Sequence, residues 1–209
     1  ASACRQLMSI LALCPPINTP WSLLLGHDGQ GISGLEHITH REPLAQIAGL
    51  LQRSGLVQVQ GERFSMHQLL QRAVRREVAG GADAAARLID GRVGGEDLKA
   101  SDVYREMLPA AYHVVKEVRL VEAARNEWCM KAQERVAALM GWLGGGALEV
   151  EIRRAIVQEL NGNGDDPGYA TALTGLASAL FNVGRYAEAL DLQEQTLAFQ
   201  RRVLLADHP

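Results

Sequence analysis

Two histidines in the first quarter of the chain have a spacing that could serve a metal ion. His37 and His40 are three residues apart, so adjacent helical turns could present both imidazoles on one side. No cysteine or other third ligand lies near this pair. We therefore interpret the two histidines as surface or loop residues and expect no metal site.

A glycine pattern precedes the histidines, and it could suggest a phosphate-binding loop. Gly29-x-Gly31-x-x-Gly34 formally fits the dinucleotide fingerprint, which requires a preceding strand and an acidic residue further on. Here the preceding segment is short and begins at Pro20, and no acidic residue lies near position 55. We expect a loop. The phosphate loop Gly-x-x-x-x-Gly-Lys-Ser/Thr and the nucleophile elbow Gly-x-Ser-x-Gly are absent from the sequence, so we expect no catalytic residues in this segment.

The elements that position these residues can be inferred from hydrophobic periodicity. Residues 3–14 and 43–54 follow a helical period, and a short helix is expected after Pro20. Residues 56–66 switch to period two on both sides of a turn at Gly61, which predicts a β-hairpin. A further helix is expected from about His67. The expected order is two helices, a third helix, a β-hairpin and a final helix. This order predicts a winged-helix module at residues 1–80.

The middle of the chain changes composition. Residues 81–100 are rich in glycine, so we expect a linker there, with a short helical patch at 84–89. Helices are expected at about 102–118, 123–143 and 147–160. The inward face of the first of these should consist of Met107, Leu108, Ala111, Val114 and Val115.

The last 45 residues contain a short motif that occurs twice. Asp165-Asp166-Pro167 is followed 42 residues later by the similar Asp207-His208-Pro209, and two helical patterns meet between these motifs at Gly184. Two amphipathic helices in one period predict a helical hairpin that must stack on neighbours. Subtracting 40 aligns Gly184 with Gly144, so residues before Asp165 read as a divergent copy. The apolar faces are expected to comprise Ala172, Leu173, Leu176, Ala179, Leu180 and Val183 in the first helix, and Tyr186, Ala189, Leu190, Leu192, Leu197 and Val203 in the second.

This hairpin resembles a known repeat family. The matching residues are Leu173, Leu176, Ala177, Leu180, Gly184, Tyr186 and Ala189. They fit the tetratricopeptide pattern, and Gly-Arg-Tyr-Ala-Glu-Ala at 184–189 resembles the longer variety found in kinesin light chains. The resemblance implies a mainly α protein whose residues 101–209 form a right-handed solenoid of tetratricopeptide-like repeats. The last well-formed repeat would span about 168–209.

The first eighty residues resemble a second family. Leu50-Leu51-x-x-Ser54-Gly55-Leu56-Val57 and the run Phe64–Gln71 are similar to the winged-helix region of signal-transducing (STAND) ATPases. That resemblance implies that His67 senses the phosphates of ADP, although Gln68 stands where the family motif often has Asp. It also implies an upstream ADP- or ATP-binding domain in a longer protein. No cofactor is expected in this segment, and both ends of the chain read as cuts through a longer protein.

The two resemblances together imply a non-catalytic regulatory segment. The repeat array would bind a protein or peptide partner, with Asn182, Arg185 and Gln193 as candidate contacts, and the winged helix would couple binding to nucleotide state. One alternative is a DNA-binding transcriptional regulator, and another is a kinesin-light-chain-like cargo adaptor. The net charge of −3 disfavours nucleic acid, so the cluster Arg72, Arg75 and Arg76 is interpreted as a solvated basic face.

Three cysteines without a Cys-x-x-Cys pair favour a reducing cytosol over a disulfide scaffold, and we expect a cytoplasmic protein. No apolar run approaches the length of a membrane span, so no membrane contact is expected. The second helix of the last repeat should expose Leu190, Leu197 and Val203, and these apolar side chains favour association with another molecule. We therefore expect self-association through the C-terminal repeat.

Overall fold

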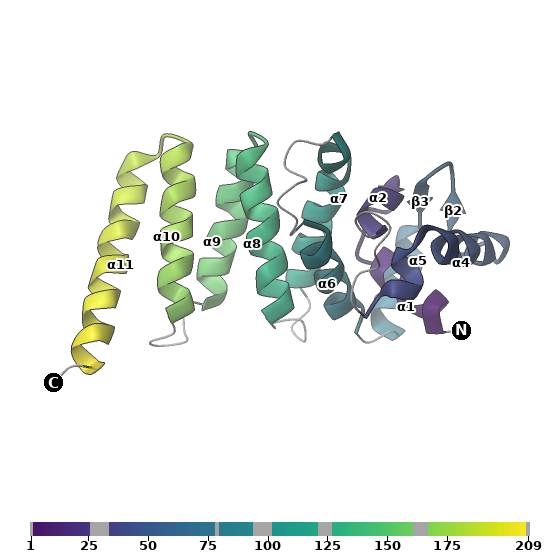
Figure 1. The fold of residues 1–209 in the computed structure, drawn as a ribbon, viewed down its shortest axis with the longest axis horizontal. Helices are drawn as coiled ribbons and strands as arrows, with labels where there is room; N and C mark the ends of the chain where they lie inside the picture. Colours follow the sequence, from purple (N-terminus) through teal and green to yellow (C-terminus); the bar gives the residue numbers. More distant parts are fainter. Residues whose placement is uncertain are drawn as a thin grey trace. The chain divides into compact units, whose positions relative to one another are not determined.

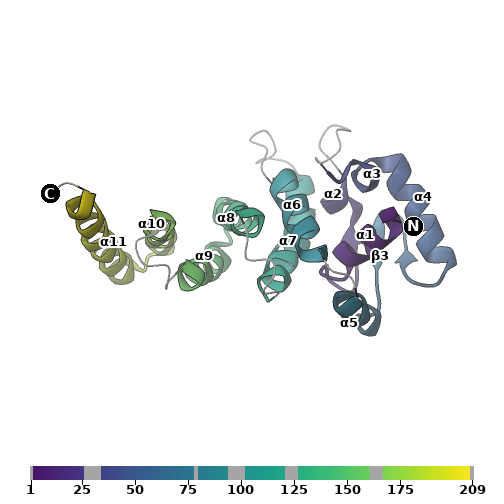
Figure 2. The same cartoon turned by 90° about the horizontal axis from the view of Figure 1, so that it is seen from below.

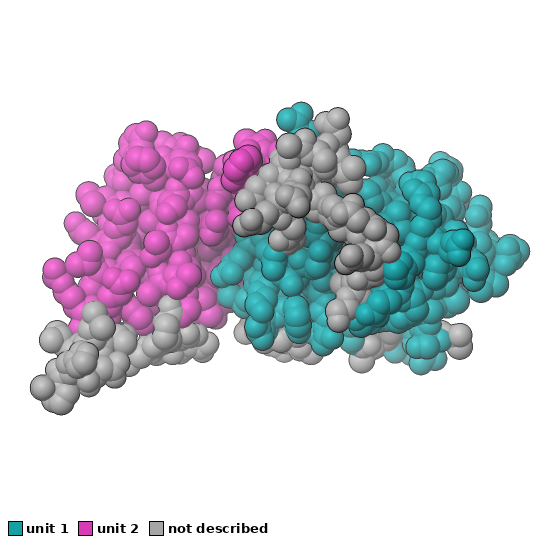
Figure 3. Space-filling view, viewed as in Figure 1, with its two compact units in different colours: residues 1–136 teal, residues 137–209 magenta. Residues whose placement is uncertain are grey.

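A computed structural model describes residues 2–25, 34–77, 80–93, 102–120, 127–160 and 167–207. The chain divides into two compact units, residues 1–136 (unit 1) and residues 137–209 (unit 2), which Figure 3 colours separately. The division falls inside helix α8 (Glu127–Trp142). Helices dominate the described residues, as the mainly α expectation required.

Unit 1 contains a small antiparallel sheet. Strands β2 (Gln58–Val59) and β3 (Arg63–Ser65) form the expected hairpin, in which Gln58 pairs with Ser65. Gly61 lies in the turn at a φ of 57°, a conformation that side-chain-bearing residues rarely adopt. A third strand, β1 (Thr19–Pro20), pairs with β3 and gives the order β1-β3-β2. The sequence did not predict β1, because two residues are too few for a period.

The same part of the chain contains the helices α1 (Ser2–Leu11), α2 (Trp21–Leu24), α3 (Glu36–Thr39), α4 (Arg41–Arg53) and α5 (Gln68–Glu77). Of these, α2 packs against β1 and α4 packs against β2. The helices expected near 3–14, after Pro20, at 43–54 and from His67 are thus confirmed. Phe64 of β3 is 1% exposed and stacks on Trp21 with ring centroids 5.5 Å apart. The core around it includes Leu7, Ile10, Leu23, Leu35, Ile38 and Leu44.

Residues 81–93 are helical beyond the expected patch. They form helix α6 (Gly81–Val93), which packs against α1 and against α7 (Asp102–Arg119). Its glycine content was misleading, because the decisive residues are alanines: Ala85 and Ala86 are buried, as are Leu88 and Ile89. Small side chains let α6 approach α1 closely. A methyl group on Gly81 would lie 2.9 Å from the Ser9 Cβ. The helical patch expected at 84–89 is therefore confirmed and extends over residues 81–93. The role of residues 81–100 as a linker stays a prediction, and residues 94–100 lie outside the described part.

Helix α7 presents to the core the face expected from its sequence. Met107, Leu108, Ala111, Val114 and Val115 are all buried, and the helix continues through Pro109. Side-chain contacts also join α7 to the first eighty residues, since Arg63 pairs with Glu106 and Arg75 pairs with Glu117. The expected boundaries of residues 1–80 and 101–209 as separate domains stay a prediction.

Unit 2 consists of the end of α8 and three further helices, α9 (Gly146–Leu160), α10 (Pro167–Asn182) and α11 (Tyr186–Asp207). Helix α10 lies between α9 and α11 and packs against both (Figures 1 and 2). The core of this unit comprises Val150, Leu176, Ala179, Leu180 and Ala189. None of the described helices is long and apolar enough to span a membrane.

Candidate interaction surfaces

The turn between α10 and α11 has a defined hydrogen-bond pattern. Gly184 takes a φ of 81°, its N–H donates to the Phe181 carbonyl, and the Arg185 N–H donates to the Leu180 carbonyl. These two bonds satisfy carbonyls at the end of α10 that have no partner within the helix, in the manner of a Schellman motif. The turn therefore ends one helix and begins the next within three residues.

The turn between α8 and α9 repeats this pattern forty residues earlier. Gly144 has a φ of 84°, its N–H donates to the Gly141 carbonyl, and the Gly145 N–H donates to the Met140 carbonyl. Adding 40 to the residue number of each donor and acceptor in this turn gives the corresponding residue of the turn between α10 and α11. The alignment of Gly184 with Gly144 is thus confirmed, and residues before Asp165 contain a second turn of the same kind.

Helix α10 offers a polar outer face. Thr171, Thr174, Ser178 and Asn182 are exposed, and the Ser178 hydroxyl donates to the Thr174 carbonyl at 3.0 Å. Asn182 was a candidate contact, and it lies at the C-terminal end of this face. The sequence interpretation missed the other three residues. Polar residues at helical spacing, on the side of the helix opposite its apolar positions, were the sequence signal for this face.

The other two candidate contacts lie elsewhere in unit 2. Arg185 is in the turn, where its guanidinium donates to both carboxylate oxygens of Glu188 at 2.5 and 2.6 Å. Arg154 of α9 also approaches Glu188, at 3.4 Å. Gln193 is exposed on α11. The three predicted residues therefore do not share one helix face.

A buried ion pair lies where α9 meets α10. Glu149 is 6% exposed, and the Arg153 Nε donates to its Oε1 at 2.8 Å. Two glycines make room for this pair. A methyl group on Gly141 would lie 2.0 Å from the Glu149 Oε2, and one on Gly175 would lie 2.7 Å from an Arg153 Nη1. Side chains from α9 thus fill space that glycines leave on the helices either side of it.

Helix α11 buries only part of the expected face, since Ala189 is buried and Leu192 packs against the core of unit 2, as expected. Ala189, Thr196 and Phe199 are buried, whereas Leu190 and Leu197 are 56% and 49% exposed. Thr196 is satisfied inside the unit because its hydroxyl donates to the Leu192 carbonyl at 2.8 Å. The expected single apolar stripe is wrong in this respect, since α11 carries apolar residues on two faces. Val203 lies among the residues whose side chains are not described.

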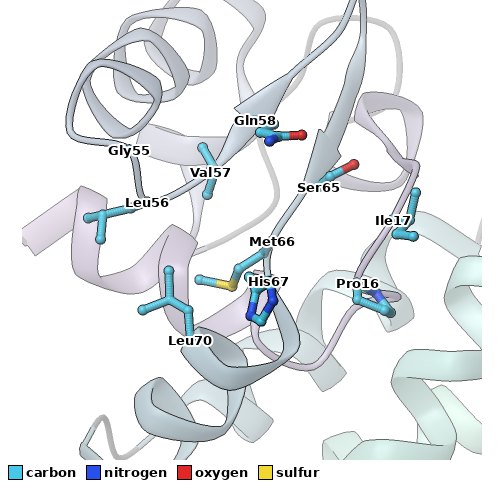
Figure 4. Close-up of a pocket in the computed structure, with 10 residues that line it drawn as sticks. All are labelled: Pro16, Ile17, Gly55, Leu56, Val57, Gln58, Ser65, Met66, His67 and Leu70. Carbon is cyan, nitrogen blue, oxygen red and sulfur yellow. The ribbon is translucent and has the colours of Figure 1, made fainter.

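His67 lies at the start of α5, beside a pocket of about 240 Å³ (Figure 4). Its Nδ1 accepts a hydrogen bond from the Leu69 N–H at 3.2 Å, so the imidazole caps the helix. The pocket is lined by both strands of the hairpin and by α5, including Leu56, Val57, Ser65, Met66 and Leu70. Ile17 lines the other side and is 66% exposed.

The three arginines of α5 have different environments. The Arg75 Nε donates to the Ala12 carbonyl at 2.6 Å, and its guanidinium also binds Glu117 of α7. Arg75 is thus a partly exposed cross-link inside unit 1. Arg72 and Arg76 are exposed. For the part of the chain that the structure describes, no ion pair is recorded for either of them.

The remaining candidates do not form a site in the described residues. Of the glycine pattern, Gly29 and Gly31 lie outside the described part. The His37 Nε2 contacts the Gln6 Oε1 at 2.5 Å. Among the described residues, no group of three or more His, Cys, Asp or Glu side chains could hold a metal ion. Arg41 at the start of α4 is paired with Glu62 of the hairpin, and both Arg41 and Arg53 at the other end of this helix are exposed.

Comparison with known proteins identifies part of the chain. Residues 170–209 match the tetratricopeptide repeat family model, which covers most of α10 and the whole of α11. No curated protein and no solved structure matches the chain. The match supports the resemblance noted for the last hairpin and indicates a module for contacts between proteins.

Proposed function

We propose that this chain is a non-catalytic regulatory segment that binds a protein or peptide partner through its helical repeats. The observation that carries the proposal is the α10–α11 hairpin, which matches the tetratricopeptide model and has a turn that recurs forty residues earlier. Such hairpins are stacked units whose outer residues contact extended or helical segments of other proteins.

The partner surface that we propose is the polar face of α10, with Thr174, Ser178 and Asn182 as contacts. These side chains are short and exposed, so a peptide backbone can approach the helix closely. Hydroxyl and amide groups can donate to or accept from peptide groups of either polarity. Arg185 stays a candidate at the end of this face, where Glu188 holds its guanidinium in place.

The order of elements in unit 1 supports the proposal of a winged helix. Strand β1 follows α1, and the β2–β3 hairpin lies between α4 and α5. The three strands form one sheet in the order β1-β3-β2. In a longer STAND-type protein, His67 would contact a nucleotide phosphate held by an upstream domain. Because Nδ1 accepts the Leu69 N–H, a neutral imidazole carries its proton on Nε2, which is then available as a donor.

A photoreactive residue at Ser178 tests the partner surface. In the full-length protein in its own cells, it should capture one recurrent protein, which a photoreactive residue at the exposed Leu50 of α4 should not capture. The captured protein should then bind the wild type and lose affinity for Ser178→Arg. Equal capture at both positions, or equal affinity for both proteins, would contradict the proposed surface.

The nucleotide role is tested by ADP titration of the full-length protein. His67→Ala should weaken ADP binding about 10-fold, the effect of losing one hydrogen bond to a charged group. Arg72→Ala, on the outer side of α5, is the matched control and should leave ADP affinity unchanged. An unchanged affinity of His67→Ala would remove this part of the proposal.

A further inference from the structure

We propose that unit 2 binds an uncharged, extended peptide segment, which lies along α10 and places an apolar side chain on Trp142 of α8. Thr174, Ser178 and Asn182, the proposed contacts on α10, are called the α10 row below. The inference rests on the proposed function and deepens it, because it states the conformation and the chemistry of the partner segment and adds Trp142 to its contacts.

The two hydroxyls of the α10 row are acceptors toward a partner. The Thr174 Oγ1 donates its proton to the Ala170 carbonyl at 2.9 Å, and the Ser178 Oγ donates its proton to the Thr174 carbonyl at 3.0 Å. A hydroxyl has one proton and two lone pairs, so each oxygen keeps the capacity to accept a hydrogen bond. Both residues are exposed. The row therefore suits a partner that offers N–H groups.

The spacing of the α10 row matches that of an extended chain. Its members are four residues apart, which places them about 6 Å from one another along the helix axis. In an extended segment, the N–H groups on one side recur at every second residue, about 6.6 Å apart. A helical partner uses its N–H groups internally and would leave these acceptors without donors. The row thus favours an extended segment over a helix.

Trp142 extends this surface onto α8. Subtracting 40 from Ser178 and Asn182 gives Ala138 and Trp142, and both are exposed, Trp142 at 68%. The C-terminal ends of α8 and α10 lie at the same edge of unit 2 and on the same side of α9 (Figures 1 and 2). Ala138, one turn before Trp142, is too small to cover the indole. The ring therefore gives a flat apolar surface at the position that Asn182 has on α10.

The exposure of Trp142 does not depend on the stacking of a further repeat. The hairpin α10–α11, which follows α8 and α9, is present in the structure, and its α10 packs against α9. Close to Trp142, Leu139 and Met140 are 7% and 4% exposed, so unit 2 buries the apolar residues of α8 that it needs and leaves the indole outside. A hairpin stacked on α11 would lie on the side away from α8. Trp142 is thus free for a partner molecule.

The surface carries no charge of its own. Helix α10 has no Asp, Glu, Lys or Arg, and neither does the stretch 136–148 that contains Trp142. Arg185, just beyond α10, is already paired with Glu188. A charged partner side chain would lose its hydration here without gaining a counter-ion. The contacting positions of the partner are therefore neutral, with proline or an aliphatic residue on Trp142.

Selection of random peptides on the 209-residue chain tests the chemistry of the partner segment. Phage-displayed peptides of about 12 residues, long enough to follow the α10 row, are selected on the wild type and counter-selected on Ser178→Arg, so that only binders of the row are kept. The kept peptides should be poor in Asp, Glu, Lys and Arg. Their Kd should change less than about 2-fold between about 50 and about 500 mM NaCl, because no ion pair is screened.

The outcomes of this selection separate the inference from the proposed function. Charge-rich peptides, or an affinity that falls about 10-fold or more in salt, would overturn the inference while partner binding on α10 stands. A selection that keeps no peptide would overturn the proposed function and the inference with it.

Two measurements on a kept peptide test its placement. Trp142→Ala should weaken binding at least about 10-fold, because buried indoles dominate many interfaces. Leu69→Ala removes a side chain of unit 1 that is also 68% exposed and should bind as the wild type does. Circular dichroism verifies that both variants fold. Equal affinity of Trp142→Ala and the wild type would overturn the role of Trp142.

N-methylation of single peptide residues tests the extended conformation. Each methyl group removes one N–H, so affinity should fall several-fold at every second residue and stay unchanged at the residues between them. Losses without this alternation would overturn the extended arrangement.

Discussion

Helices α8 and α9 meet at the same kind of turn as α10 and α11, yet α9 and α11 carry different side chains at equivalent positions. At positions 149 and 153, α9 has a glutamate and an arginine, which form a largely buried ion pair beside Gly141 of α8 and Gly175 of α10. The α11 equivalents are Ala189, which is buried against α10, and Gln193, which is exposed. The same hairpin turn is thus followed by two different sets of side chains.

This difference separates what makes a hairpin from what makes a neighbour. The turn depends on a glycine with positive φ and on two backbone hydrogen bonds, so many sequences can form it. The surface that packs against a neighbouring helix depends on side-chain volume and charge at particular positions. On α9, Arg153 fits beside Gly175 of α10, whereas Gln193 at the equivalent position of α11 is exposed. The turn therefore specifies the repeat, and the face specifies its partner.

Breaking the largely buried ion pair should have a large effect on stability. Glu149→Ala leaves the Arg153 guanidinium without its carboxylate between two helices, and we expect a loss of about 3 kcal/mol in the free energy of unfolding. Urea unfolding followed by circular dichroism measures this. Gln158→Ala, an exposed change on the same helix, is the control and should alter stability by less than about 0.5 kcal/mol.

Replacing both residues of the ion pair tests whether α9 needs the charges or only the volume of these side chains. Glu149→Leu with Arg153→Met gives α9 an apolar face of similar volume, which should restore most of the lost stability. If Glu149→Ala costs no more than Gln158→Ala, the ion pair does not hold α9 against α10. The contrast between the two hairpins would then rest on the glycines alone.

Leucines at neighbouring positions of unit 2 should differ in their contributions to stability. Leu180 of α10 is 1% exposed, and Leu180→Ala should cost about 2–5 kcal/mol by removing buried methyl groups and leaving a cavity. Leu190→Ala should cost less than about 1 kcal/mol, because that side chain is already half in water. Urea unfolding compares the two variants. Equal losses would mean that Leu190 is as deeply buried in solution as Leu180.

The two turn glycines should have small and nearly equal effects on stability. Gly144→Ala and Gly184→Ala each place a methyl group at a positive φ, with open space around it. The expected cost is about 1 kcal/mol for each, because the strain is local to the backbone. Thermal unfolding of both variants measures the difference between them. A gap greater than about 1 kcal/mol would show that the two turns are not equivalent.

Sequence periodicity was sufficient for the helices, the hairpin of unit 1 and the two turns, because these depend on short-range spacing and on glycine. It failed for β1, which has two residues and pairs with β3 more than forty residues away. For α6 it gave only the patch at 84–89, because the glycines on either side obscured a longer helix with buried alanines. Of the proposed contacts, Asn182 lies on α10 and Gln193 on α11, and periodicity alone did not separate the two faces.

The residues of α11 show most clearly what each level determines. By itself, the sequence determined that Leu190, Leu192, Leu197 and their neighbours form a helix after Gly184, since helical spacing and the turn are local properties. Only the tertiary structure decided that Ala189, Thr196 and Phe199 face α10 while Leu190 and Leu197 face water. Helix α11 has apolar side chains on two faces, and burial of one or the other depends on which face its neighbour covers.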